Sequence, residues 1–435
     1  MAKAIEIEEP VTVTVATATS PSNLAAVPQL IKELAEGVGC LESGCNEARQ
    51  ALVTQARSLV QALETPRETM IKHCWAQPAV FAAILCGNEC GLWKLMAKNG
   101  DKPQKVKELA CALGVDPVLL SAMGYLLEVG EDEYKPTSFS LSLSLPIMNG
   151  GYPALITMGG PSFINLHEYE RSRNWKNPTD AKDSPLMHAH KTDLNYFDLA
   201  ASRGYLEDFN NHMGGYRQGR LPWMAPEFVP VQEVLIKGAD QSPDAVFMVD
   251  VGGCLGHDLL EFHRYHPTVP GKLIVQDLPQ VVGSIIPSEE NKALTPMAHN
   301  FFEEQPIKGA RAYYLHSVLH DWPDDRAEVI VGRIKAAMRP GYSKLLINEN
   351  VIPRTDAYWE TSALDLVMLS QLSAQERTER DWRDLVEGRC GLAIVKIWSG
   401  GRGVESLIEY LFPIRANPVD YKLFQIAGYN QILLT

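Results

Sequence analysis

The sequence has few of the features that mark membrane, secreted or nucleic-acid-binding proteins. No uninterrupted apolar segment is long enough to cross a bilayer, and residues 1–20 lack the basic start and compact apolar stretch of a secretory signal. Basic side chains are in the minority, 40 Lys and Arg against 53 Asp and Glu, which gives a formal net charge of −13. Phosphate contacts need clustered Lys or Arg, so this balance argues against nucleic acid and anionic lipid as partners. We therefore expect a cytoplasmic protein that acts on a small-molecule substrate, with no nucleic-acid or membrane partner.

Metal-binding cysteine patterns are also missing. The eight cysteines do not show paired metal-ligand spacing, and Cys40 with Cys45 gives only a weak zinc or disulfide signal. Others, such as Cys86, Cys90 and Cys111, lie in apolar helical patterns. We expect reduced, structural thiols and no metal site.

The chain is too long for one hydrophobic core, since it has 435 residues. Residues 1–22 show neither a helical period nor a charge pattern, and we interpret them as a disordered lead-in. The remaining parts are expected to be a helical and winged-helix dimerisation domain over 23–150, a helical substrate-pocket linker over 151–240, an α/β catalytic domain over 241–411 and a C-terminal extension over 412–435.

Helices dominate the first of these parts. Between residues 23 and 63 apolar side chains recur mostly at threes and fours, as an amphipathic helix pair requires, and we expect a second subunit to cover the stripe. Helices are predicted over 106–113 and 117–129, followed by a short strand and wing in 131–143. Winged helices often bind DNA, but the second helix has few basic residues, so DNA binding is not expected.

Short apolar runs alternate with helical stretches in the C-terminal half. The runs are 245–251, 272–278, 310–316, 344–350, 393–398 and 405–411. This alternation predicts a parallel sheet covered on both faces, which is a Rossmann-like α/β architecture.

The sharpest local motif follows the first run and reads VDVGGCLGHD, residues 249–258. Glycine permits a tight strand-to-helix turn and close approach of a ligand. Asp277 ends the next strand, about twenty residues on, where a carboxylate can accept hydrogen bonds from both ribose hydroxyls. The turn has Gly-Gly-x-x-Gly in place of the dinucleotide pattern, and Asp250 would repel phosphate but suit an amine. S-adenosylmethionine (SAM), with an α-amino group and a sulfonium, fits these features.

From about residue 79 to residue 411 the chain resembles the fungal and plant small-molecule O-methyltransferases. The resemblance is carried by VDVGGCLGHDL, LIVQDLPQVV, AHNFFEEQP, ARAYYLHSVLHDWPDD, MRPGYSKLLINENVIP and LDLVMLSQLSAQERTERDW, in that order. It implies a SAM-binding Rossmann-like domain behind an N-terminal helical and winged-helix domain, and a homodimer formed through the N-terminal helices.

The resemblance also implies roles for single residues. His320 is the general base for the substrate hydroxyl, and its ordinary pKa of about 6.5 suits that role. Glu349 and Glu376 flank its imidazole, orient it and stabilise its protonated form. Asp321, next to the base in sequence, is less easily aimed at it and is interpreted as a helix cap.

The cofactor and substrate residues follow from the same match. The implied cofactor-binding residues are Gly252, Asp277, Leu278, Asn300, Phe301 and His316, with Asn300 and Phe301 meeting the adenine. The implied lining of an apolar acceptor pocket is Phe209, Asn210, Met213, Met368 and Leu372. The chain departs from the family at two of these positions, because Asn300 replaces the aspartate of many relatives and His316 replaces an Arg or Lys. The second change is expected to weaken cofactor binding and to make it pH-dependent.

The expected activity is SAM-dependent O-methylation of a phenolic or enolic secondary metabolite by in-line displacement, without a metal. One alternative keeps the fold and cofactor but changes the chemistry, since some fungal relatives act as pericyclases or dehydratases on polyketide-derived intermediates without methyl transfer. Retention of His320, Glu349 and Glu376 favours transfer. Another alternative, a regulatory dimer, is disfavoured by the acidic balance and the complete catalytic set.

Overall fold

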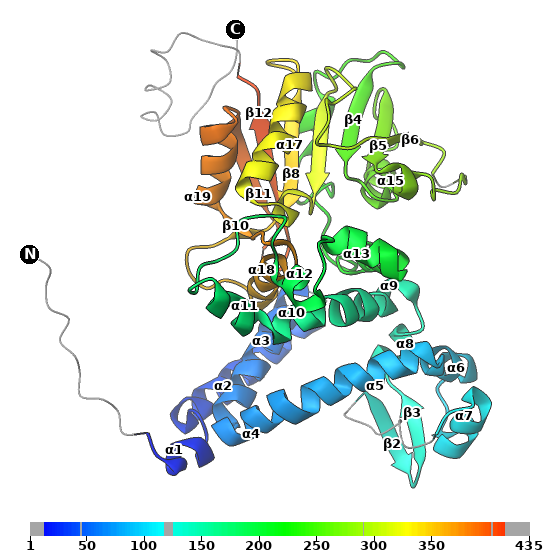
Figure 1. Ribbon diagram of the computed structural model, residues 1–435, viewed down its shortest axis with the longest axis vertical. Coiled ribbons are helices and arrows are strands. Elements are labelled where there is room, and N and C mark those ends of the chain that lie inside the picture. Colours follow the sequence, from blue (N-terminus) through cyan, green and yellow to red (C-terminus); the bar gives the residue numbers. More distant parts are fainter. Residues whose placement is uncertain (1–12, 44–45, 117–124, 290, 402, 414–435) are drawn as a thin grey trace, which may run out of the picture. The chain divides into compact units, whose positions relative to one another are not determined.

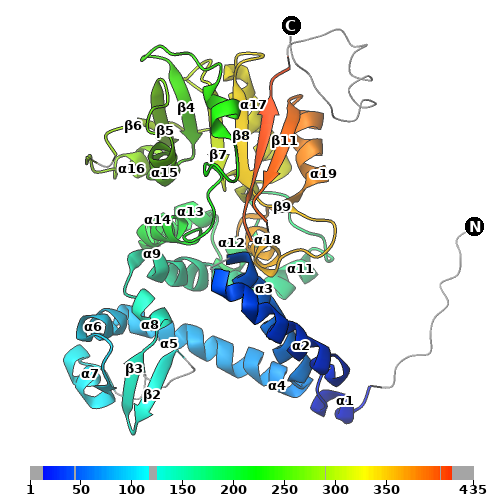
Figure 2. The same ribbon diagram turned by 180° about the vertical axis from the view of Figure 1, so that it is seen from behind.

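A computed structural model describes residues 13–43, 46–116, 125–289, 291–401 and 403–413 (Figures 1 and 2). The chain divides into two compact units, Met1–Ser144 and Leu145–Thr435. The linker predicted over 151–240 is thus part of the second unit, together with the α/β domain. The extension predicted from residue 412 lies almost wholly outside the described residues.

The N-terminal unit is mostly helical. The expected helix pair is confirmed as α2 (Val27–Val38) packed against α3 (Asn46–Leu63). The unit continues with α4 (Pro66–Ile71), a π-helical turn (Lys72–Ala76), α5 (Gln77–Glu89), α6 (Leu92–Asn99) and α7 (Val106–Leu113). In the part of the chain that the structure describes, no single helix is both long enough and apolar enough to span a membrane. The bent pair Pro66–Glu89 and Leu92–Asn99 is long and apolar enough only when its two helices are taken together.

Two local predictions for this unit are corrected. Val15–Thr19 forms the short helix α1, although residues 1–22 were expected to lack structure. Leu126–Gly130 is strand β2 and not the end of a helix over 117–129, whose residues 117–124 lie outside the described chain. Strand β2 pairs with β3 (Glu133–Pro136) through a tight turn in which Asp132 adopts a φ of +55°, and this pairing outweighs the helical preference of the leucines. Strand β1 (Gln104–Lys105) completes the three-stranded wing, and α8 (Ser138–Ser142) follows it.

Short helices open the second unit. They are α9 (Pro146–Asn149), a π-helical segment (Tyr152–Gly159), α10 (Gly160–Ile164), α11 (Leu166–Ser172), α12 (Pro185–His190), α13 (Tyr196–Arg203) and α14 (Leu206–Gly215). Helices α13 and α14 matter most for the site, because they lie across the carboxyl edge of the sheet in both views (Figures 1 and 2).

A seven-stranded sheet with the order β11-β12-β8-β7-β4-β5-β6 forms the body of this unit. Its strands are β4 (Val246–Val251), β5 (Lys272–Asp277), β6 (Leu294–Ala298), β7 (Ala312–His316), β8 (Lys344–Glu349), β11 (Ala393–Ser399) and β12 (Ser406–Leu411). Strands β6, β5, β4, β7 and β8 are parallel. The prediction of an all-parallel sheet is wrong at one edge, where β12 runs antiparallel to both β8 and β11. The connection of residues 400–405 is too short for the crossover that a parallel pair needs, so it makes a hairpin.

Helices cover both faces of the sheet, because its central strands are apolar on both sides (Figure 1). On one face, α17 (Asp324–Ala337) packs on a core that includes Val249, Tyr313 and Leu315. On the other, α15 (His257–Tyr265) packs on a core that includes Met248 and Tyr314. The remaining α-helices and strands are α16 (Pro279–Val282), α18 (Trp359–Leu372), the pair β9 (Val351–Ile352) and β10 (Arg377–Thr378), and α19 (Glu379–Trp382).

The strand order reverses between β4 and β7. The chain builds β4, β5 and β6 outward in one direction and then returns to place β7 and β8 on the other side of β4. In open α/β sheets, ligands bind outside the carboxyl ends of the strands at such a reversal. The topology thus predicts a ligand site among the residues that follow β4 and β7.

Candidate active site

A cavity of about 330 Å³ lies at this point. Its floor comes from the segments that follow β4, β5 and β7, including Gly252, Asp277 and Ser317. Residues of α13 and α14, including Phe197 and Phe209, supply the opposite wall. The cavity therefore lies entirely within the second unit.

The glycine turn after β4 forms one end of the cavity. Gly252 has a φ of +77°, and an added Cβ would lie 2.9 Å from the Val318 side chain, so only glycine fits. Asp250 lies just before the turn, is 1% exposed, and has no hydrogen-bond partner for either carboxylate oxygen within the described chain. Burial, reinforced by the nearby Asp258 carboxylate, raises the pKa of Asp250 well above its ordinary value. An unpartnered buried carboxylate is costly unless a ligand supplies a donor or a positive charge.

Asp277 occupies the end of β5, where the sequence predicts a ribose acceptor. Its Oδ2 accepts a hydrogen bond from the Cys254 backbone N–H at 2.8 Å, and its Oδ1 accepts one from the Leu278 N–H at 2.7 Å. These bonds fix the carboxylate at the cavity wall and leave lone pairs for a ligand. Burial raises the pKa of Asp277.

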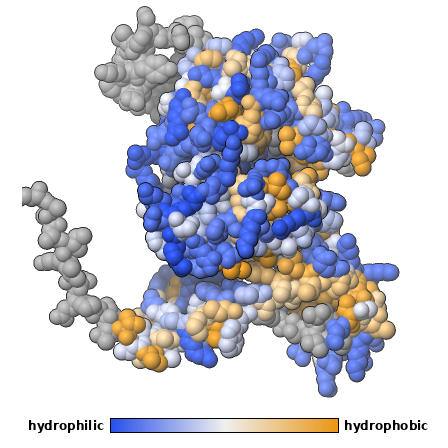
Figure 3. All heavy atoms as spheres, viewed as in Figure 1, coloured by the Kyte–Doolittle hydropathy of each residue, from blue (hydrophilic) through white to orange (hydrophobic). Residues whose placement is uncertain are grey.

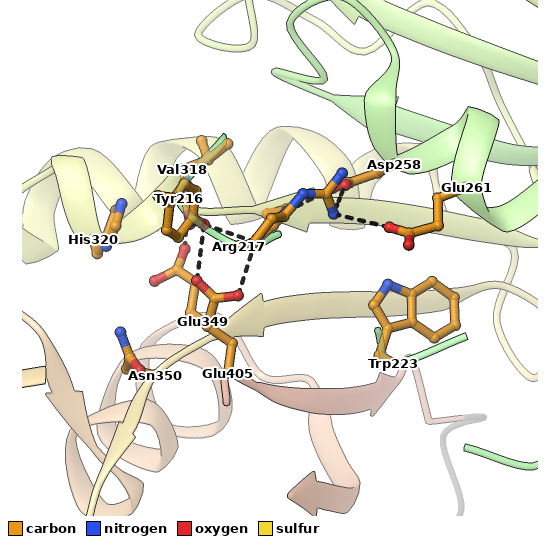
Figure 4. A network of polar contacts seen from close by, with 12 residues as sticks. Tyr216, Arg217, Trp223, Asp258, Glu261, Val318, His320, Glu349, Asn350 and Glu405 are labelled. Carbon is orange, nitrogen blue, oxygen red and sulfur yellow. Dashed lines mark hydrogen bonds and ion pairs between the residues drawn. The ribbon is translucent and has the colours of Figure 1, made fainter. Parts of the chain in front are cut away.

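His316, at the end of β7, is the centre of a buried network of polar and charged groups. Its other members, Tyr216, Arg217, Asp258 and Glu405, are labelled in Figure 4. The Nδ1 of His316 lies 2.6 Å from Asp258 Oδ2, and its Nε2 lies 3.1 Å from Glu405 Oε2. The Tyr216 hydroxyl donates to Glu405 Oε1 at 2.9 Å and lies 3.1 Å from His316 Nε2. Arg217 pairs with Asp258. The network joins the linker, α15, β7 and the segment before β12.

The two carboxylates determine the charge of His316. Burial alone would lower the pKa of His316, but Asp258 and Glu405 outweigh burial and raise it to about 10. In turn, His316 and Arg217 overcome the effect of burial on Asp258 and hold its pKa well below the ordinary value. His316 is therefore charged at neutral pH, as an Arg or Lys at this position would be. Any pH dependence that this residue contributes belongs near pH 10, not near neutrality.

His320 lies in a 3₁₀ turn, Leu319–Asp321, that follows β7. Its Nδ1 is 2.6 Å from Glu376 Oε1, and its Nε2 is 3.5 Å from Asp321 Oδ1. Burial lowers the pKa of His320, but Glu376 and Asp321 outweigh it and raise the value to about 10. In Figure 4 His320 lies at one end of the group and Trp223 and Glu261 lie at the other, with Arg217 between them.

Glu349, at the end of β8, holds the backbone of this turn. Its Oε1 accepts hydrogen bonds from the N–H groups of Val318 at 3.2 Å and Leu319 at 2.7 Å. It acts on the His320 imidazole through charge, without a hydrogen bond in the described structure. Of the two glutamates expected to flank the base, Glu376 contacts the ring and Glu349 fixes the segment that carries it.

The cavity brings together most of the residues predicted from the sequence. The predicted residues that line it are Gly252, Asp277, Leu278, Asn300, Phe301, His316, Phe209, Asn210 and Met213. His320, Glu349 and Glu376 are buried beneath its wall and are not among the described lining residues. Met368 and Leu372 do not line it either, since Met368 is buried within α18 and Leu372 packs against a separate apolar cluster around Met158 and Leu186.

Sequence reasoning missed several residues that the structure places at the site. Asp258 ends the glycine motif, but a lone acidic residue there gives no sign of its partners. Tyr216, Arg217 and Glu405 are distant in sequence and carry no motif. Asp321 was interpreted as a helix cap, whereas it lines the cavity.

Comparison with known proteins identifies the family. Residues 231–391 match the O-methyltransferase domain. The chain is 33% identical to O-methyltransferase mpaG of Penicillium brevicompactum, over 88% of this chain and 98% of that one. It is 36% identical to methyltransferase cfoC of Aspergillus candidus, over 83% and 90% of the two chains. The chain belongs to the SAM-dependent O-methyltransferase family.

Solved structures confirm the class I O-methyltransferase fold. A structure described as a pericyclic reaction enzyme matches this O-methyltransferase family member with a TM-score of 0.78 at 26% identity, covering 89% of this chain and 99% of that one. OxaC in complex with sinefungin and meleagrin gives a TM-score of 0.78 at 24% identity, with the same coverage. The fold is thus common to proteins of different chemistry, and the site must decide the reaction.

The residues present in this O-methyltransferase fit SAM. The unpartnered Asp250 carboxylate suits the cofactor's ammonium group, Asp277 suits the ribose hydroxyls, and the bare backbone at Gly252 permits close approach. When bound, SAM supplies an electrophilic methyl group on a sulfonium.

Proposed function

We propose that the protein transfers the methyl group of SAM to a hydroxyl of a phenolic or enolic secondary metabolite. The observation that carries this proposal is a cavity that has the glycine turn and Asp277 at its floor and Asp321 in its lining, with the His320 ring 3.5 Å from the Asp321 carboxylate and 2.6 Å from Glu376. Nucleoside-binding residues and proton-accepting residues at one cavity are what transfer to a weakly acidic hydroxyl requires.

The lining favours a flat, apolar acceptor. Phe197 and Phe209 meet edge to face, with ring centroids 5.6 Å apart, and Phe301 and Trp322 meet in the same way at 6.1 Å. Aromatic walls select planar ligands by shape and apolar contact. An aromatic or polyketide-like compound with one acidic hydroxyl fits this lining.

The chain's own groups would bind the acceptor, orient it and remove the proton of its hydroxyl. Aromatic contacts from α13 and α14 would hold the acceptor over the floor of the cavity, which lowers the entropic part of the barrier. The cluster of Glu376, His320 and Asp321 would take up the hydroxyl proton. Closure of the cavity by the helical segments would exclude water, a competing nucleophile.

Incubation with SAM labelled in its methyl group, together with a panel of phenols, enolic pyridones and tetramic acids, tests the proposal. We expect a product that gains one labelled methyl. An unlabelled isomer or dehydrated product would support the pericyclase or dehydratase alternative, whose fold this chain shares. A reaction without cofactor, run in parallel, separates spontaneous rearrangement from catalysis.

We further propose that the protein is a homodimer formed through its N-terminal helices. Apolar side chains of this unit are exposed in the single chain, among them Ile31, Val53, Val60 and Trp75, and Figure 3 shows several apolar patches on this unit. Exposed apolar area of this kind is typical of protein interfaces. Sedimentation velocity should give twice the chain mass, and a paired substitution of Ile31 and Val60 by Asp should give the monomer.

A further inference from the structure

The Asp250 carboxylate lies against the glycine turn. A Cβ added at Gly253 would lie 2.5 Å from Asp250 Oδ2 and 2.9 Å from its Oδ1, so the carboxylate is in contact with the bare Cα of Gly253. Both residues are among those that line the cavity. The carboxylate therefore adjoins the floor of the cavity, where the cofactor is expected.

Within the described chain, no donor reaches this carboxylate. Neither oxygen of Asp250 has a hydrogen-bond partner there, and the residue is 1% exposed. Backbone donors of the turn are used elsewhere, because the N–H groups of Gly252 and Gly253 both donate to the Gln276 carbonyl. A buried carboxyl group without donors is costly as an anion and much less costly as a neutral acid.

The cations near Asp250 are already balanced by other carboxylates. Arg217 and His316 are the two cations that face it. Arg217 pairs with Asp258 (Figure 4). His316 lies between Asp258 and Glu405. Two cations and two carboxylates sum to zero charge, so an ionised Asp250 would add an uncompensated negative charge to this buried group.

Other titratable groups that face Asp250 supply no positive charge; they are Asp277 at the end of β5, Tyr314 on β7 and Cys254 in the glycine turn. The Tyr314 hydroxyl donates to Asp258. The Cys254 thiol donates to Asn210. Burial does most to raise the pKa of Asp250, and the nearby cations do not reverse this direction.

We propose that Asp250 is a neutral carboxylic acid in the free protein and that it releases its proton to solvent when SAM binds. The O–H bond of the carboxyl group breaks, its electron pair stays on oxygen, and the carboxylate so formed balances the ammonium group of the cofactor. No other reactant is needed. The inference concerns cofactor binding alone and does not depend on the proposed methyl transfer.

Calorimetry of SAM binding in two buffers counts the protons released. At about pH 6.5 the amine of SAM is charged, since an α-amino group titrates at about 7.7–8.0. Phosphate and Bis-Tris differ in their enthalpy of ionisation, so the difference between the binding enthalpies in the two buffers gives the number of protons. We expect about one proton per SAM for the wild type and none for Asp250→Asn. The control Asp325→Asn, at an exposed position in the first turn of α17, should match the wild type.

Two relatives of the cofactor make the same test on the wild type, without any substitution. S-adenosylhomocysteine keeps the ammonium group and lacks the sulfonium charge, so it should release the proton as SAM does. 5′-Methylthioadenosine keeps the nucleoside and lacks the amino-acid group, so it should release none. Equal release with both ligands would place the proton on another group and overturn the inference.

The dependence of affinity on pH gives an independent measurement. Because binding releases a proton, the SAM affinity of the wild type should rise about tenfold from about pH 6 to about pH 7, and that of Asp250→Asn should stay nearly constant. Infrared difference spectra should show the C=O band of a buried carboxylic acid disappear when SAM is added to the wild type. A band that persists in the complex would contradict the release.

The outcomes separate this inference from the proposed function. SAM binding to the wild type without proton release, or equal release from Asp250→Asn, would overturn the inference and leave methyl transfer untouched. A panel in which no acceptor gains label, with proton release intact, would overturn the proposed function alone. Failure of the wild type to bind SAM would overturn both.

Discussion

Replacing His316 by Gln should destabilise the second unit in a way that depends on pH. His316 lies between the carboxylates of Asp258 and Glu405, with its pKa raised from 6.5 to about 10. Because the pKa is higher in the folded state, the charged imidazole stabilises the fold fully below pH 6.5. That contribution is lost as the pH rises through about 10.

The size of the effect follows from the pKa. A change from 6.5 to about 10 corresponds to about 5 kcal/mol at about 1.4 kcal/mol per pH unit. Removing one partner of a buried ion pair typically lowers the free energy of unfolding by about 3–5 kcal/mol, and this range agrees with the value from the pKa. We therefore expect His316→Gln to lower the free energy of unfolding by about 3–5 kcal/mol at pH 7 and by less than about 1 kcal/mol above pH 10.5.

Urea unfolding at several pH values, followed by tryptophan fluorescence, measures this difference. Trp223 is a suitable reporter, because its indole N–H donates to Tyr314 and the Tyr314 hydroxyl donates to Asp258. His73→Gln, at an exposed histidine of the N-terminal unit, controls for general effects of losing a histidine. If His316→Gln lowers the free energy of unfolding by the same amount at pH 7 and pH 10.5, the idea of a buried imidazolium at this position is refuted.

Three further variants test the rest of the site. Gly252→Ala should weaken SAM binding at least tenfold in calorimetry, because a φ of +77° strains a side chain by roughly 1–2 kcal/mol and the new methyl would lie 2.9 Å from Val318. The control Gly332→Ala, which has open space around it, should bind SAM normally, and equal SAM affinities of the two variants would contradict this reasoning. Asp250→Asn should raise the Tm of the cofactor-free protein, since burial raises the pKa of this unpartnered carboxylate. The same variant should show a smaller rise in Tm when SAM is added, and an undiminished rise would exclude Asp250 as the site of the SAM ammonium group. Glu376→Gln removes the carboxylate that does most to raise the pKa of His320 from its ordinary value to about 10, so ¹⁵N NMR should show the His320 ring losing its proton at lower pH. An unchanged titration would show that another group raises the pKa of His320.

The sequence predicted the elements that depend on local pattern. The apolar runs that became β4, β5, β7 and β8 were found because a strand buried on both faces must be apolar throughout. The glycine turn and Asp277 were found because their backbone and hydrogen-bonding demands limit the residue type. Strand direction at the edge was not predictable from the runs themselves, since an apolar run does not reveal its partner.

Contacts between distant residues were beyond the sequence. Tyr216 and Glu405 are joined by a hydrogen bond across 189 positions, and no local pattern marks either one. The place of Asp321 in the cavity lining was not predictable, because sequence alone does not show which residue of a short turn borders a cavity. Met368 has the apolar character of a pocket residue, but the same character suits the helix core where it lies.

The antiparallel hairpin of β11 and β12 affects where this enzyme can be cut. The stretch that matches the methyltransferase domain stops at residue 391, ahead of both hairpin strands, and begins after Tyr216 and Arg217. A fragment trimmed to those limits would leave the flank of β8 unpaired and deprive the β7 imidazole of one of its two counter-ions. The smallest excisable catalytic piece must therefore extend from the helices before residue 216 through the last strand.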